Sequence, residues 1–136
     1  LRIALIKHDA HGFELDQPGK DSYRLRKAGA DTMVLSGPDQ TARLETHTAG
    51  APSLNQLISS VEHADLILIE GYKFGSQPKI QLLRKGYSET PVGNQEQTIA
   101  YVSDFPYDAA PSELPVFDLN KPQDLAEYLV SCFGLK

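Results

Sequence analysis

The chain has 136 residues, of which 40% are hydrophobic, and 13 basic against 18 acidic residues give a formal net charge of −5. That size suffices for one compact core, so we expect a single domain over residues 1–136. The acidic balance excludes a general attraction to nucleic acid or to an anionic membrane, and no apolar run approaches the roughly 18 to 20 residues that span a bilayer. With one cysteine, Cys132, the chain can form no internal disulfide, and we expect a cytoplasmic location.

The first half of the chain predicts alternating strands and helices. Residues 3–6 form a continuous apolar run, which is typical of a strand buried on both faces of a parallel sheet. A polar loop follows, and we expect Asp21 to cap a helix over residues 22–28 that ends at Gly29. Two further apolar stretches around the turn at Gly37 predict strands that would form a hairpin over residues 31–47.

A second helix is expected after Ser53, a suitable N-cap, because the residues that follow place an apolar stripe on one face. That stripe consists of Leu54, Leu57, Ile58 and Val61. Four apolar runs then predict strands over residues 66–69, 79–83, 98–102 and 115–117. Pro122 opens a terminal helix with Leu125, Leu129 and Cys132 on its apolar side. Together these elements predict an α/β fold with a predominantly parallel sheet flanked by helices.

Polar residues follow the predicted strands where they end. The first strand ends at Lys7-His8-Asp9, and the strand over residues 66–69 ends at Glu70-Gly71-Tyr72-Lys73. Ligands of open α/β sheets bind beyond the carboxyl ends of the strands. His8, Asp9 and Glu70 are therefore expected to point toward the same place if these two strands are neighbours. Ser103-Asp104 forms a third polar strand end.

Several segments of the chain resemble the MobB proteins, the accessory family of molybdenum cofactor guanylylation. The resemblance rests on residues 6–13, 16–30, 65–73, 78–80, 100–106 and 117–120, and so spans nearly the whole chain. It implies a P-loop GTPase-like fold, binding of GTP with Mg²⁺, slow hydrolysis, a homodimer, and assistance to the guanylyltransferase that attaches GMP to molybdopterin.

Family members begin with a strand, a G-x-x-x-x-G-K-[ST] phosphate loop and a helix, and these 136 residues contain no such loop. Leu1 would correspond to the start of the second strand of the family. The backbone amides and the lysine of that loop supply much of the phosphate binding. We therefore expect the 136 residues alone to be impaired in GTP binding, with an apolar sheet surface left exposed.

The resemblance implies that the loop with His8, Asp9 and His11 responds to the nucleotide, with Asp9 near the magnesium ion. Glu70 would orient magnesium-bound water, and Gly71 would let the backbone approach a γ-phosphate. Two alternatives remain for the loop: the spacing His-Asp-x-His is also that of a zinc or iron site, and it is equally found in a solvated loop. For Glu70 the alternative is a carboxylate beside a glycine turn.

Three further groups are candidate ligand contacts. The start of the helix after Gly19 carries Lys20, Asp21 and Arg24, which could hold a phosphate of a nucleotide or of molybdopterin. Lys73 could meet an anionic ligand, and Ser103-Asp104 lies where many GTPases place the carboxylate that binds guanine. The ordinary alternatives are a turn with an N-cap, an exposed lysine and a turn-forming aspartate.

Two functions remain open from the sequence. The first is a GTP-binding accessory protein of molybdenum cofactor guanylylation. The second is a non-catalytic interaction module that binds molybdopterin or a partner nucleotidyltransferase through the helix that begins near Lys20. Retained pterin binding without a nucleotide response would favour the second.

Overall fold

A computed structural model describes all residues of the chain, from Leu1 to Lys136. The chain divides into two compact units, and each is described by itself. The first unit comprises Leu1–Lys7 and Glu62–Lys136, and the second comprises His8–Val61.

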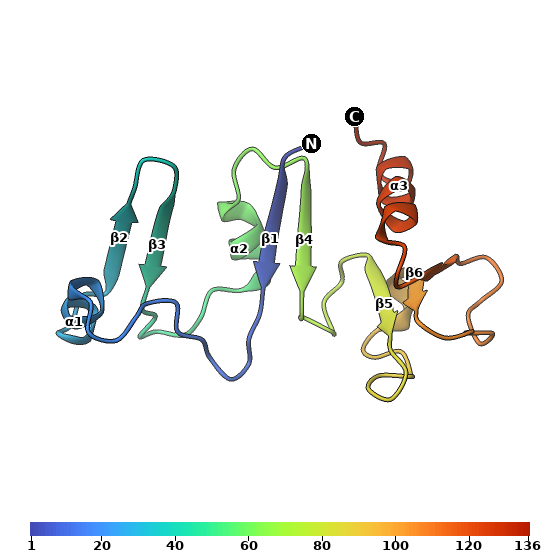
Figure 1. Ribbon diagram of the computed structural model, residues 1–136, viewed down its shortest axis with the longest axis horizontal. Helices are drawn as coiled ribbons and strands as arrows, with labels where there is room; N and C mark the ends of the chain where they lie inside the picture. Colours follow the sequence, from blue (N-terminus) through green and yellow to red (C-terminus); the bar gives the residue numbers. More distant parts are fainter. The chain divides into compact units, whose positions relative to one another are not determined.

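A parallel strand pair brings the start of the first unit beside its middle. β1 (Ile3–Lys7) pairs with β4 (Leu66–Glu70) in a register that begins with Ile3 opposite Leu66 (Figure 1). At the entry to this pair, the carboxylate of Asp65 accepts a 2.7 Å hydrogen bond from the Arg2 backbone N–H. That bond and the Arg2 guanidinium lower the pKa of Asp65. The two strands whose polar ends were expected to meet are indeed neighbours.

One face of the β1–β4 pair is open to solvent. Ile3, Leu5 and Leu68 are 52%, 66% and 40% exposed, whereas Ala4 and Ile6, the alternate residues of β1, are half-buried. Successive strand residues point to opposite faces, so the exposed side chains share one face. The expectation that this apolar strand is buried on both faces is wrong, because alternate side chains along it are exposed. The expected exposure of apolar sheet surface agrees with this finding.

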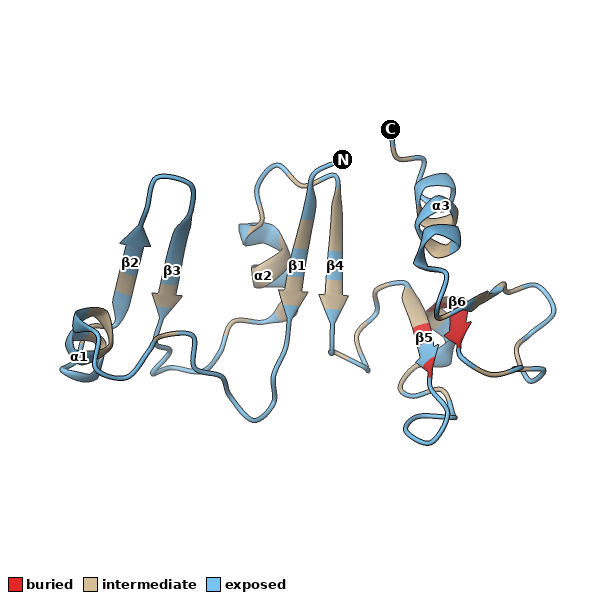
Figure 2. Ribbon diagram, in the orientation of Figure 1, coloured by how far each residue is buried: buried red, intermediate tan, exposed pale blue.

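The buried core of the first unit lies in a second parallel sheet. Its strands are β5 (Lys79–Leu83), β6 (Thr98–Ser103) and β7 (Val116–Asp118), with β6 in the middle. A short 3₁₀ helix, η1 (Gln95–Gln97), leads into β6. The most buried apolar side chains are on β5 and β6 (Figure 2), and they are Leu83, Ala100, Tyr101 and Val102. The central strand is buried because it has a partner on each side.

The terminal helix α3 (Pro122–Cys132) is held to this sheet by an aromatic residue. The Tyr128 hydroxyl donates a 2.9 Å hydrogen bond to the Ile99 carbonyl, and the Tyr128 ring lies 5.3 Å from the ring of Phe117. Pro122 is at the start of the helix, as expected. Cys132 follows Tyr128 by four residues and lies on the same face of the helix, as expected, but its side chain is exposed. It lies in the last turn of the helix, beyond the half-buried Tyr128 and Leu129.

No helix in the structure combines the length and the apolar character that crossing a membrane requires.

Replacing Tyr128 with phenylalanine keeps the ring contact and removes the hydrogen bond to β6. We expect Tyr128→Phe to lower the free energy of unfolding by about 1 kcal/mol, the typical net value of one such bond. Urea denaturation followed by circular dichroism measures this change. Tyr87→Phe is the matched control: Tyr87 is 82% exposed, and its substitution should change stability by less than about 0.5 kcal/mol. Equal effects of the two substitutions would contradict the role of the hydroxyl group.

The second unit contains α1 (Asp21–Lys27) and an antiparallel pair, β2 (Thr32–Ser36) with β3 (Thr41–Glu45). The hairpin expected over residues 31–47 is therefore confirmed. The N-cap of α1 is Lys20, whose side chain makes no capping bond, and Asp21 is the first helical residue. The expectation that Asp21 caps the helix is thus displaced by one residue. As an acidic group in the first turn, Asp21 still suits the positive end of the helix dipole.

The helix α2 (Leu54–Ser60) ends the second unit. Ser53 caps it as expected: its hydroxyl oxygen accepts a hydrogen bond from the Gln56 N–H, and the Gln56 side chain accepts one from the Ser53 N–H. The residues of the predicted apolar stripe are half-buried, while the intervening polar residues are exposed.

Candidate functional site

The carboxyl ends of β1 and β4 carry an ion pair. Lys7 lies opposite Glu70, and the Lys7 Nζ donates to both carboxylate oxygens of Glu70 at 2.9 and 3.1 Å. Both side chains are more than half exposed. His8 and Asp9 follow Lys7 directly but belong to the second unit. Lys7 is not among the site residues predicted from the sequence. The signal that could have identified it is its position at the end of the first strand, which is equivalent to the position of Glu70 at the end of the paired strand.

The backbone after Glu70 adopts an uncommon conformation. Gly71 and Tyr72 both have positive φ, +94° and +48°, and left-handed backbone is costly for a residue with a side chain. The next residue, Lys73, lies against another segment: a Cβ built on Gly93 would be 2.0 Å from the Lys73 carbonyl oxygen. The turn after β4 is thus held by close backbone contact with the connection between β5 and β6.

The ammonium group of Lys79 stabilises the same turn. Its Nζ donates to the carbonyl oxygens of Gly75 and Gln77 at 2.6 and 3.4 Å, so this lysine ties the turn together. The side chain of Lys73, by contrast, is exposed.

The third polar strand end, Ser103-Asp104, is in a different sheet from Glu70. Ser103 is buried and its hydroxyl donates to the Phe105 carbonyl at 2.7 Å. One carboxylate oxygen of Asp104 accepts from the Lys85 backbone N–H at 2.8 Å. Both side chains therefore stabilise local loop structure, and the sheet pairing does not place them at the same edge as Glu70.

The loop after β1 does not contain a ready metal site. Asp9 Oδ1 accepts a 2.9 Å hydrogen bond from the His11 N–H, which is a local turn. No set of three or more His, Cys, Asp or Glu side chains, including His8, Asp9 and His11, is gathered to hold a metal ion. The zinc or iron alternative is therefore unsupported. Proteins often bind magnesium through one or two carboxylates plus substrate phosphates, and Asp9 and Glu70 each supply a carboxylate of that kind.

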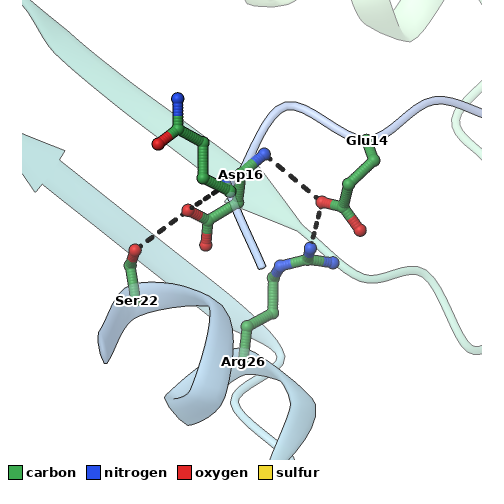
Figure 3. Close-up of polar contacts among 5 residues, drawn as sticks. Glu14, Asp16, Ser22 and Arg26 are labelled. Atoms are coloured by element: carbon green, nitrogen blue, oxygen red, sulfur yellow. Dashed lines mark hydrogen bonds and ion pairs between the residues drawn. The ribbon is translucent and has the colours of Figure 1, made fainter. Parts of the chain in front are cut away.

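Two carboxylates hold the same loop onto α1 (Figure 3). Arg26 forms an ion pair with Glu14, and the Ser22 hydroxyl donates to Asp16 at 3.0 Å. The hydrogen bond from Arg26 lowers the pKa of Glu14, and the same bond raises the pKa of Arg26. Arg26 Nε and Asp16 Oδ2 are buried and make no hydrogen bond. Sequence reasoning missed Glu14 and Arg26; their only signal was opposite charge on the loop and on the last turn of the helix.

A cavity of about 340 Å³ lies beside this ion pair, within the second unit. It is bounded by the loop at Phe13, by α1 through Arg26, and by the end of β3 and the residues after it. Lys20, Asp21 and Arg24, the candidate phosphate contacts, are exposed on α1 and are not part of its lining.

Comparison with known proteins gives one consistent family. Residues 1–104 match the family described as "Molybdopterin guanine dinucleotide synthesis protein B". The "Molybdopterin-guanine dinucleotide biosynthesis adapter protein" of Escherichia coli K12 is 36% identical, over 96% of this chain and 75% of that protein. The protein of the same description from Haemophilus influenzae is 28% identical, over 95% and 71%. A solved structure of Bacillus subtilis MobB superimposes with a TM-score of 0.69 and 28% identity, covering 95% of this chain and 78% of that one.

Proposed function

Because the chain belongs to the MobB family, whose similar members are named adapters of molybdopterin-guanine dinucleotide biosynthesis, we propose that it is such an adapter and engages the guanylyltransferase of this pathway. The observation that carries the proposal is the 36% identity to the Escherichia coli adapter over 96% of the chain. The predominantly parallel α/β fold supports it, since the solved MobB structure shares that fold.

We place the nucleotide of this adapter at the carboxyl ends of β1 and β4. Glu70 is the proposed group for magnesium-bound water, and Asp9 is a proposed magnesium contact of the loop that follows β1. The left-handed backbone at Gly71 supports close approach of a γ-phosphate, because no side chain intervenes there. The Lys7 ammonium is bound to the Glu70 carboxylate, so magnesium at Glu70 would replace one cation with another. Triphosphate would then be the natural new partner of Lys7.

The remaining candidates keep the roles that the resemblance implies. His8 and His11 belong to the proposed nucleotide-responsive loop, and Ser103-Asp104 is the proposed guanine contact. The exposed cations around α1 and the turn after β4 are proposed contacts for phosphate groups of GTP or molybdopterin. These are Lys20, Arg24 and Lys73, together with Asp21 at the start of the helix. We also propose a cytoplasmic homodimer.

A direct binding measurement tests the adapter proposal. The chain is immobilised for biolayer interferometry, and the guanylyltransferase from the same organism is the analyte. We expect saturable binding that bovine serum albumin does not reproduce, and an increased rate of molybdopterin guanylylation when the chain is added to the enzyme. Absence of both effects would rule out the adapter role.

GTP binding of the 136-residue polypeptide is a separate prediction. These residues contain no G-x-x-x-x-G-K-[ST] loop, so the main donors to a triphosphate are not among them. We expect isothermal titration with GTP and magnesium to show weak binding or none. Tight binding would contradict this expectation and would show that other groups, such as Lys7 and Lys73, replace the loop. Retained pterin binding with no response to GTP would instead support the non-catalytic interaction module.

A further inference from the structure

The cavity beside Arg26 combines apolar walls with two opposed ion pairs. Phe13 and Leu15 line it and are 70% and 72% exposed, so both offer apolar surface that a ligand could cover. At about 340 Å³ it is within the range, from about 300 to 1,000 Å³, of sites for small organic molecules. Leu44 adds an apolar contact from β3.

The charged lining groups come in pairs of opposite sign. Arg26 is paired with Glu14, and Arg43 is paired with Glu45 at 2.6 Å. Because these four charges sum to zero, the cavity has no net attraction for a triphosphate or another simple polyanion. A ligand suited to it carries hydrogen-bond donors and acceptors side by side.

Each pair leaves hydrogen-bonding capacity unused. The Glu45 interactions with Arg43 involve Oε1, which leaves Oε2 to accept from a ligand. The Arg26 guanidinium has five N–H donors, and its bond to Glu14 uses a single one of them. Each of the two ion pairs therefore presents a hydrogen-bond acceptor next to a hydrogen-bond donor at the wall of the cavity.

We propose that this cavity binds the 2-amino-4-oxopyrimidine ring that pterins and guanine share. The ring N–H and the 2-amino group of that ring would donate to Glu45, and its 4-oxo group would accept from Arg43 or Arg26. The planar ring would lie against Phe13, where aromatic contact adds to the burial of apolar surface. The assignment rests on the proposed adapter function, because molybdopterin and guanine are the two compounds named in the family description that carry this ring.

Two titrations of the full 136-residue chain test the assignment and separate the two sources of the ring. Biopterin binding is followed by pterin fluorescence anisotropy, and guanosine binding by displacement of biopterin and by calorimetry. We expect saturable binding of biopterin or guanosine. Tighter binding of biopterin would assign the cavity to the pterin, and tighter binding of guanosine would assign guanine to this cavity in place of Ser103-Asp104.

Variants at exposed lining residues locate the binding. Glu45→Gln replaces an acceptor with an amide and should weaken binding at least tenfold, and Phe13→Ala should weaken it through loss of the ring contact. Neither residue is buried, and circular dichroism verifies that each variant folds. The matched control is Glu127→Gln, an exposed carboxylate on α3 in the other unit, which should bind as the unaltered chain does.

Two results would overturn the assignment. The first is no saturable binding of either compound at millimolar concentration. The second is that the Glu45→Gln and Phe13→Ala variants both bind with the affinity of the unaltered chain. Binding of the chain to the guanylyltransferase is measured in a separate experiment and does not depend on either result. Failure of this site is therefore distinguishable from failure of the adapter role. Conversely, ring binding at this cavity without any interaction with the enzyme would support the site and contradict the adapter proposal.

Discussion

Replacing Gly93 with alanine is expected to lower the free energy of unfolding by about 2 to 4 kcal/mol. Two causes add at this position. The backbone has φ of +74°, which disfavours any residue with a Cβ, and the added Cβ would lie 2.0 Å from the carbonyl oxygen of Lys73. Backbone atoms cannot rotate away as a side chain does, so either the Lys73 turn or the connection to β6 must move. Urea denaturation gives the stability, and amide hydrogen exchange around Gly71 reports displacement of the turn.

Gly86 supplies a matched control for the clash. It lies in the same connection with φ of +76°, but a Cβ there meets nothing within 4 Å. Gly86→Ala should therefore cost only the backbone penalty, about 1 kcal/mol. The difference between the two variants measures the cost of the contact with Lys73. If Gly93→Ala were no worse than Gly86→Ala, the close approach between the two segments would be contradicted.

Replacing Gln81 with leucine is expected to have the second largest effect, about 1 to 3 kcal/mol of stability. The Gln81 side chain is 4% exposed on β5, and its amide forms two hydrogen bonds with the backbone of Val92. A third bond joins its Nε2 to the Thr98 hydroxyl at 3.3 Å. Leucine fills similar space but leaves these groups without partners, so the connection between β5 and β6 should detach from the sheet. Hydrogen exchange of the Val92 amide should accelerate together with the loss of stability.

Gln123 provides the control for this substitution. It is exposed in the first turn of α3 and its side chain makes no hydrogen bond, so Gln123→Leu should leave stability within about 0.5 kcal/mol of the unaltered chain. A similar loss in both variants would mean that the Gln81 amide contributes nothing specific. Because Gln81 and Gly93 both anchor the segment that supports Lys73, loss of either should disturb the turn that follows Glu70.

The sequence by itself determined the order and type of the elements and the family. Continuous apolar runs marked β1, β4, β5 and β6, and Ser53 and Pro122 marked the starts of α2 and α3, because periodicity, capping and proline geometry act over a few neighbouring residues. The long matches at residues 6–13 and 16–30 identified the family. The sequence also placed polar residues at the ends of β1 and β4, but the pairing of these strands and the contact of Lys7 with Glu70 came from the structure.

Only the tertiary structure decided which faces are buried and which polar groups meet across the chain. The apolar run at Ile3 was expected to be buried on both faces, yet alternate residues are exposed, since burial depends on what packs against a strand and not on the strand itself. The same holds for the Gln81 bonds to Val92, the contact of Gly93 with Lys73, and the cavity beside Arg26. Each joins residues at least eleven positions apart in the sequence. Periodicity and short motifs act over fewer residues and therefore do not predict such contacts.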